Sequence, residues 1–139
     1  MSDLNIRRAL ATLLISSSIP QSNIAWENTA FDPANLEYYI AFYFLPASDS
    51  AMGKTIDSSS EQLGLVQVSV FTKLNSGDYG TKYLETIDTI KAAFLDGAET
   101  SYNDQVVHVL DSSNISPTDS ESWYQGGLTV NYLAFKKRV

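Results

Sequence analysis

The single histidine of this 139-residue chain, His108, belongs to a residue type that often serves as a metal ligand or a catalytic group. It lies in Asp104–Leu110, where alternating valines indicate a strand with one buried face. A metal site there would need carboxylates from elsewhere in the fold, and a nucleophile would need a partner that spacing does not reveal. We therefore expect His108 to be structural. We predict no catalytic, cofactor-binding or metal-binding residues, and no enzymatic activity.

Two glycine-containing stretches fail as phosphate-binding motifs. Gly53-Lys54-Thr55 follows a serine, Ser48, at the position where a phosphate-binding loop needs a glycine. Gly77-Asp78-Tyr79-Gly80 lacks the third glycine of the dinucleotide-binding fingerprint. The carboxylates are scattered and form no acid–base pair in the sequence. These observations favour a binding or structural protein.

The composition predicts one domain, residues 1–139, with a sizeable core. Hydrophobic residues make up 44% of the chain and charged residues 18%. The absence of cysteine excludes disulfides and fits a reducing cytoplasm, and no apolar run is long enough to span a membrane. The net charge of −7 argues against binding to a nucleic-acid backbone, although acidic walls would let a DNA duplex pass without sticking.

The N-terminal segment, residues 4–15, predicts a helix with two apolar faces. One face carries Ile6, Leu10, Leu13 and Leu14, and the second carries Leu4, Ala11 and Ile15. The second face is either covered by neighbouring loops or meets another subunit.

An aromatic segment, Glu37–Leu45, predicts a strand that is bulky on both faces. Ile40, Phe42 and Phe44 alternate with Tyr39, Ala41 and Tyr43, and a shorter strand is predicted at Ile24–Glu27. Such a strand is central in a sheet or has one face against a partner chain. The serine-rich segment that follows, residues 46–61, predicts a long flexible loop, either slack or an arm that orders on a partner.

The segment from Gln62 to Leu95 predicts a strand, a glycine turn and an amphipathic helix. Valines alternate at positions 66, 68 and 70; the buried helix stripe is Tyr83, Ile87, Ile90 and Phe94, widened by Leu84 and Leu95. Asp78 is the predicted N-cap, and Gly97 the left-handed stop. Asp111–Ser122 predicts a polar loop, and Leu128–Phe135 the last strand. The expected fold is a single α+β domain: a mostly antiparallel or mixed sheet of about five strands with two main α-helices packed on it.

The order of several short motifs resembles the tail terminator proteins of long-tailed, siphovirus-type bacteriophages. The motifs are Ala25-Trp26-Glu27-Asn28 with Phe31-Asp32-Pro33, the aromatic strand ending in Leu45-Pro46, Gly64-Leu65-Val66-Gln67-Val68, the glycine turn, the helix closing on Phe94 and Gly97, Trp123, and the strand Leu128–Phe135. They cover nearly the whole chain. The N-terminal helix is matched by type alone.

The resemblance implies a structural protein that assembles as a ring, usually of six copies, on the end of a finished tail tube. There it stops tube polymerisation and provides the head-joining surface. The implied partners are further copies, the tail tube protein, a head-completion or connector protein, and double-stranded DNA that passes through the lumen without specific binding. No cofactor and no membrane are expected. The implied location is the neck end of the virion tail, after synthesis in the host bacterial cytoplasm.

A closing ring requires two different patches on each subunit. The candidate interface residues are the second face of the first helix, the outer face of the aromatic strand and the arm: Leu4, Ala11, Ile15, Tyr39, Ala41, Tyr43, Met52, Lys54 and Ile56. Alternatives are a head–tail connector, neck or minor tail protein. From another class, the chain would be a small-ligand-binding module or minor hydrolase that uses the aromatic strand as a pocket wall.

Overall fold

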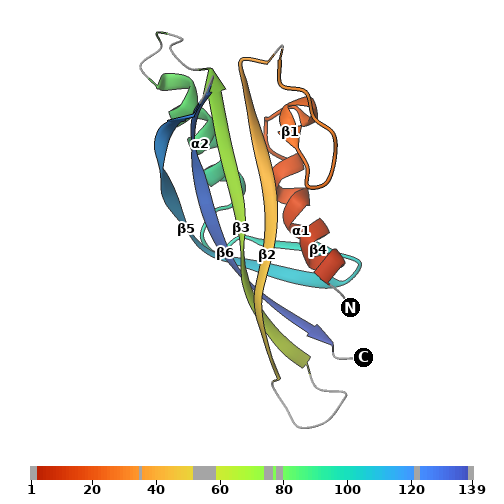
Figure 1. The fold of residues 1–139 in the computed structure, drawn as a ribbon. Helices are drawn as coiled ribbons and strands as arrows, with labels where there is room; N and C mark the ends of the chain where they lie inside the picture. Colours follow the sequence, from red (N-terminus) through yellow and green to blue (C-terminus); the bar gives the residue numbers. More distant parts are fainter. Residues whose placement is uncertain are drawn as a thin grey trace.

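The computed structural model describes residues 3–34, 36–51, 59–73, 77, 80–120 and 123–137. Its elements are α1 (Asp3–Ile15), a short 3-10 helix η1 (Gln21–Asn23), β1 (Ile24–Ala25), β2 (Tyr38–Ala51), β3 (Ser59–Lys73), α2 (Thr81–Ala93), β4 (Glu99–Tyr102), β5 (Gln105–Ser120) and β6 (Trp123–Lys137). They form one sheet curled around two helices (Figure 1). The predicted α+β class is confirmed, with six strands rather than about five.

The sheet has the strand order β1-β2-β3-β6-β5-β4. The first pair, β1 with β2, is parallel, and the other four pairs are antiparallel. The long strands β2, β3 and β6 place Phe42 opposite Val68 and Val68 opposite Leu128. Because side chains alternate across a strand, one row of the sheet faces the helices and the next faces away.

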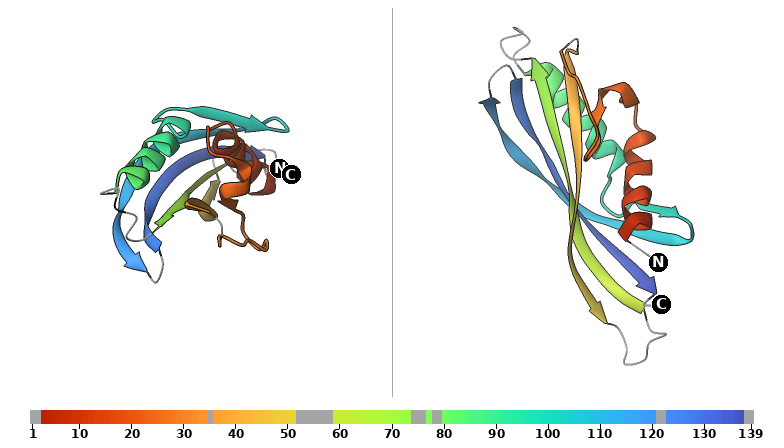
Figure 2. Two further views of the ribbon diagram at one scale, coloured as in Figure 1. Left: turned by 90° about the horizontal axis from the view of Figure 1, so that it is seen from above. Right: turned by 45° about the vertical axis from the view of Figure 1, so that its right-hand side comes forward.

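Both helices lie on the concave side of the sheet (Figure 2). In α1, Ile6, Leu10 and Leu14 are fully buried, as predicted for its first face. In α2 the predicted stripe of Tyr83, Ile87, Ile90 and Phe94 is buried as well. The core therefore lies between one curled sheet and two short helices. Neither helix of the described chain has the length and apolarity to cross a membrane.

The ends of α2 match the prediction in part. Gly97 has the predicted left-handed φ of +83°, but it is not the helix stop: α2 ends at Ala93 with Phe94 as its C-cap, and Gly97 lies in the turn from Leu95 to Ala98. The predicted N-cap, Asp78, lies outside the described residues, and the N-cap position of α2 belongs instead to Gly80, with φ +79° and no side-chain capping hydrogen bond. Leu84 and Leu95 do not widen the buried stripe, because both side chains are exposed.

Both ends of the long loop predicted for residues 46–61 are strand in the structure. β2 continues to Ala51 and β3 begins at Ser59, while residues 52–58 lie outside the described part of the chain. The pairing of Ser59 with Lys137 on β6 shows why these polar residues are extended: neighbouring strands supply their backbone hydrogen bonds. β2, β3 and β6 leave the body together as a narrow twisted extension, which we call the three-stranded arm (Figure 1).

The polar loop predicted at Asp111–Ser122 is also a strand over most of its length. β5 runs to Ser120 and pairs with β6 from Val107 to Ser120. Small polar residues suit this edge strand, since its solvent-facing side needs no apolar residues. β4 was not predicted; it is a four-residue hairpin partner of β5, packed across the end of α1 (Figure 1).

Candidate interaction surfaces

The convex face of the sheet carries an apolar surface that neither helix covers. We call it the outer patch: Tyr43, Leu45, Leu63, Leu65, Leu110, Leu133 and Phe135. Leu45 pairs with Leu65, and Leu63 pairs with Leu133, so the residues occupy neighbouring strands. Five of them, including Leu45 (47%) and Phe135 (43%), are exposed, and Leu65 and Leu133 are half-buried. Contiguous exposed apolar surface of this kind marks an interaction site more often than a free surface.

A shallow hollow lies within the outer patch, at the point where the three-stranded arm leaves the body. Leu63, Leu65 and Leu110 form its apolar walls, and Asp111 and Asn131 contribute polar groups. The Asn131 Nδ2 donates a hydrogen bond of 2.7 Å to Asp111 Oδ1, which orients the carboxylate. The hollow therefore suits an apolar side chain that has a cation beside it.

An aromatic cluster closes the other end of the same face. Tyr39 stacks on Phe71 with ring centroids 4.4 Å apart, and it meets Trp123 edge-on at 5.0 Å and Phe31 at 5.2 Å. Burial, and secondarily the neighbouring Tyr43, raises the pKa of Tyr39 above its ordinary 10.0. The aromatic end is thus covered by the chain itself, whereas the outer patch is not.

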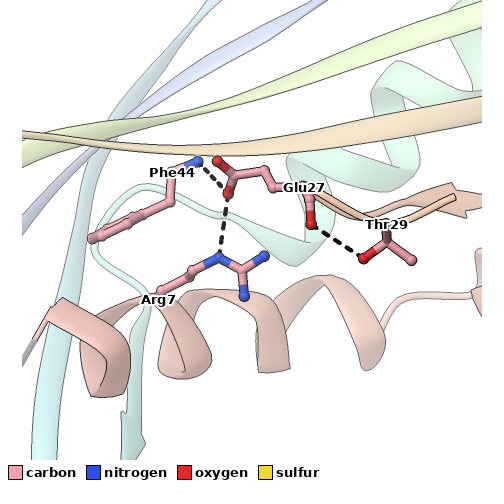
Figure 3. A network of polar contacts seen from close by, with 4 residues as sticks. All are labelled: Arg7, Glu27, Thr29 and Phe44. Atoms are coloured by element: carbon pink, nitrogen blue, oxygen red, sulfur yellow. Dashed lines mark hydrogen bonds and ion pairs between the residues drawn. The ribbon is translucent and has the colours of Figure 1, made fainter.

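The open edge of β2 is capped by a carboxylate. Glu27 Oε1 accepts a hydrogen bond of 3.1 Å from the Phe44 N–H and one of 3.2 Å from Arg7 Nε on α1 (Figure 3). The Glu27 carbonyl accepts a further bond from Thr29. The carboxylate thus occupies a backbone donor that would otherwise be open to another strand.

The open edge of β5 is irregular. Register shifts occur between Val109 and Asp111 and between Ile115 and Thr118, and Pro117, which has no N–H to donate, lies inside the second. Bulges and edge prolines discourage strand addition. With both edges blunted, side-chain contacts on the faces are the favoured route to a partner.

Buried polar contacts fix the concave face beneath the outer patch. Tyr132 Oη donates a 2.6 Å hydrogen bond to Gln62 Oε1, and Gln62 Nε2 donates to Asp3 Oδ1 at 2.9 Å. Tyr83 Oη accepts from the Gly127 N–H at 3.0 Å; burial raises the pKa of Tyr83, an effect that this hydrogen bond partly offsets. These bonds lock β3, β6 and both helices into one arrangement.

The predicted interface residues divide into four groups. Leu4 (50% exposed), Ile15 (43%) and Tyr43 (41%) are accessible, and Tyr39 is half-buried in the aromatic cluster. The other two described residues, Ala11 and Ala41, are buried by their own chain and add nothing to an exposed patch. Met52, Lys54 and Ile56, which belong to the predicted loop at residues 46–61, lie outside the described residues.

Sequence reasoning missed most of the outer patch. Leu63, Leu65, Leu110, Leu133 and Phe135 each alternate with residues that face the core. The available signal was that β3 and β6 are apolar on both faces near the three-stranded arm, the same feature that singled out the aromatic strand.

His108 lies on the outer face, opposite Leu133. Its Nδ1 is 3.6 Å from Glu99 Oε2, and both side chains are exposed. Across the described ranges no group of three His, Cys, Asp or Glu residues has the geometry to hold a metal ion. His108 and Glu99 thus form an exposed pair at the sheet surface, and neither residue lines the hollow in the outer patch.

Comparison with known proteins gives both a family and a fold. The family model described as phage tail terminator protein matches residues 5–132. No curated protein matches the sequence. A solved structure that carries no functional name has a TM-score of 0.75 to this chain, with 22% identity over 96% of each chain, which shows that the fold is shared.

Proposed function

Because the chain belongs to the phage tail terminator protein family, a family of bacteriophage structural proteins, we propose that it assembles as a ring, usually of six copies, on the end of the tail tube. The ring stops tube polymerisation and presents a surface to the head-completion or connector protein. The chain then resides at the neck end of the virion tail, after synthesis in the host cytoplasm.

The observation that carries this proposal is the uncovered outer patch. A family member that acts by contact needs exposed apolar surface that a partner can shield from water. The outer patch is such a surface, on a sheet whose other face is packed against the helices. A second exposed apolar surface, Leu4 and Ile15 on α1, lies on the helical side of the sheet. Two different patches are what a closed head-to-tail ring requires.

The acidic composition supports passage of DNA through such a ring. With sixteen acidic and nine basic residues, the subunit repels a phosphate backbone on average. DNA is thus a passing partner in this proposal, held by no specific contact.

Deletion of the gene in the phage that encodes it, with electron microscopy of the lysate, tests the function. We expect tails of uncontrolled length, restored to one length by the wild-type gene supplied on a plasmid. Full heads beside separate tails of normal length would contradict termination and support the neck or connector alternative.

A further inference from the structure

We propose that the outer patch receives the α1 helix of the neighbouring copy, with Arg8 of that helix paired to Asp111 in the hollow. The inference rests on the ring proposed above and names the two surfaces that meet. Both surfaces are exposed in the single chain, and they lie on opposite sides of the sheet. One copy cannot therefore bring them together by itself, whereas a head-to-tail pair can.

The docking surface of α1 is a stripe with one central cation. Leu4, Arg8, Thr12 and Ile15, the α1 stripe, are spaced four, four and three residues apart, so they share one face of the helix, and all four are exposed. The Arg8 guanidinium rests 5.4 Å above the Tyr102 ring, and Nη1 donates to the neutral Tyr102 hydroxyl at 3.3 Å. Its charge forms no ion pair with the described residues, in contrast to Arg7, which is paired with Glu27.

The hollow complements this stripe in shape and charge. Leucines at 63, 65 and 110 line it, and the Asp111 carboxylate is held at its side by Asn131. Glu61, opposite Phe135 of the outer patch, adds a second carboxylate to this face of the sheet. A helix with an apolar residue one turn from an arginine can contact the apolar walls and the carboxylate at the same time. Arginine pairs with a carboxylate through two parallel hydrogen bonds.

Charge decides against the other exposed helix face. α2 presents Leu84 and, just past its end, Leu95, but these are accompanied by Glu85, Asp88 and Asp96. Of the two lysines of α2, Lys91 is one turn or two from these residues, whereas Lys82 lies over the Tyr38 ring. Bringing that face to Asp111 and Glu61 would place carboxylates against carboxylates, a repulsion that suppresses wrong pairings. The α1 stripe offers an apolar contact without that repulsion.

Cysteine crosslinking on assembled tails tests the pairing, because the chain has no cysteine of its own. The variant carrying both Arg8→Cys and Asp111→Cys is supplied to the gene-deleted phage and treated with a short bismaleimide reagent. A disulfide would demand Cα atoms within about 7 Å, closer than an Arg–Asp contact needs. We expect a ladder of covalent oligomers, and none from Asp88→Cys with Asp111→Cys, the α2 control.

A charge exchange gives an independent readout. Arg8→Glu or Asp111→Lys alone should lower the amount of protein retained on purified tails by about tenfold or more, through like-charge contact, and the double variant should recover most of it. Each purified variant should unfold within a few degrees of the wild-type temperature, because both side chains are exposed and each loses only a surface contact, to Tyr102 or to Asn131.

Three results would overturn the pairing: a ladder from the α2 control pair and none from the 8–111 pair; crosslinks from position 111 to the tube protein; or full tail retention of both charge-reversed single variants. If the wild-type protein terminates tails normally in the same lysates, these results refute the contact and leave the function standing. Normal tails without any copy of the gene would instead refute the function.

Discussion

The two faces of the sheet are built from the same strands and differ in what covers them. On the concave face, Phe42, Val68 and Leu128 are fully buried under the helices. On the convex face of β2, Tyr43 and Leu45, one and three residues after Phe42, are exposed. A strand that is apolar on both faces has two surfaces to cover: the helices of the chain cover one, and in our proposal a partner covers the other.

Removing one large side chain from each face gives the largest contrast. Phe42 is fully buried and meets the Trp26 ring edge-on at 5.4 Å, so Phe42→Ala should lower the free energy of unfolding by about 3–5 kcal/mol. Leu45→Ala, on the same strand but the outer face, should change it by about 0.5 kcal/mol. Urea unfolding of the two purified variants measures both values. Equal losses would show that the outer patch is already packed within the free chain.

Gly64 tests how tightly the concave face is packed behind the outer patch. A Cβ at this position would lie 2.6 Å from the Tyr132 Oη and 2.8 Å from its ring, so Gly64→Ala must displace the tyrosine. We expect a loss of about 1–3 kcal/mol, as for other overpacked cores. The control is Gln67→Ala, a half-buried outer-face residue of the same strand, with a change near 0.5 kcal/mol. A neutral Gly64→Ala would mean that Tyr132 is not held in place.

Alkaline titration gives a smaller effect that compares the faces directly. Burial raises the pKa of Tyr38 and Tyr83 on the concave face and of Tyr39 in the outer aromatic cluster, above the ordinary 10.0. The folded chain then holds more protons than the unfolded chain, so their stabilising contribution is complete below about pH 10 and is lost as pH rises through the folded-state values. Absorbance titration of the folded protein should show late-ionising tyrosines, and Tyr39→Phe should remove one of them. If all eight tyrosines titrated together near pH 10, the burial assigned to Tyr38, Tyr39 and Tyr83 would be contradicted.

The sequence predicted those helices and strands that bury one face, because burial of one face sets the spacing of their apolar residues. The core stripes of both helices, the alternation in β2 and β3, and the left-handed φ of Gly97 follow from local rules and are confirmed. Composition predicts loops at the polar ends of β2 and β5, but the structure shows strands there. The end of β2 is extended because it pairs with β3, and the end of β5 because it pairs with β6, and composition does not record such pairing.

The candidate interface was predicted less completely than the fold. The exposed face of α1 and Tyr43 were identified, because helical and strand periodicity show which residues share a face. The leucines of the outer patch come together only through the register of four strands, for example Leu45 beside Leu65 and Leu63 beside Leu133. No spacing along the chain shows that proximity.

The most direct test of the central claim, that the outer patch is surface reserved for a partner, is tail length in phage complemented with Leu63→Ser/Leu110→Ser. Both leucines are exposed walls of the hollow, so the purified variant should lose about 1 kcal/mol at most, a few degrees in Tm. We predict a folded variant that fails to control tail length as completely as the gene deletion does. Tails of normal length made with this folded variant would contradict the claim.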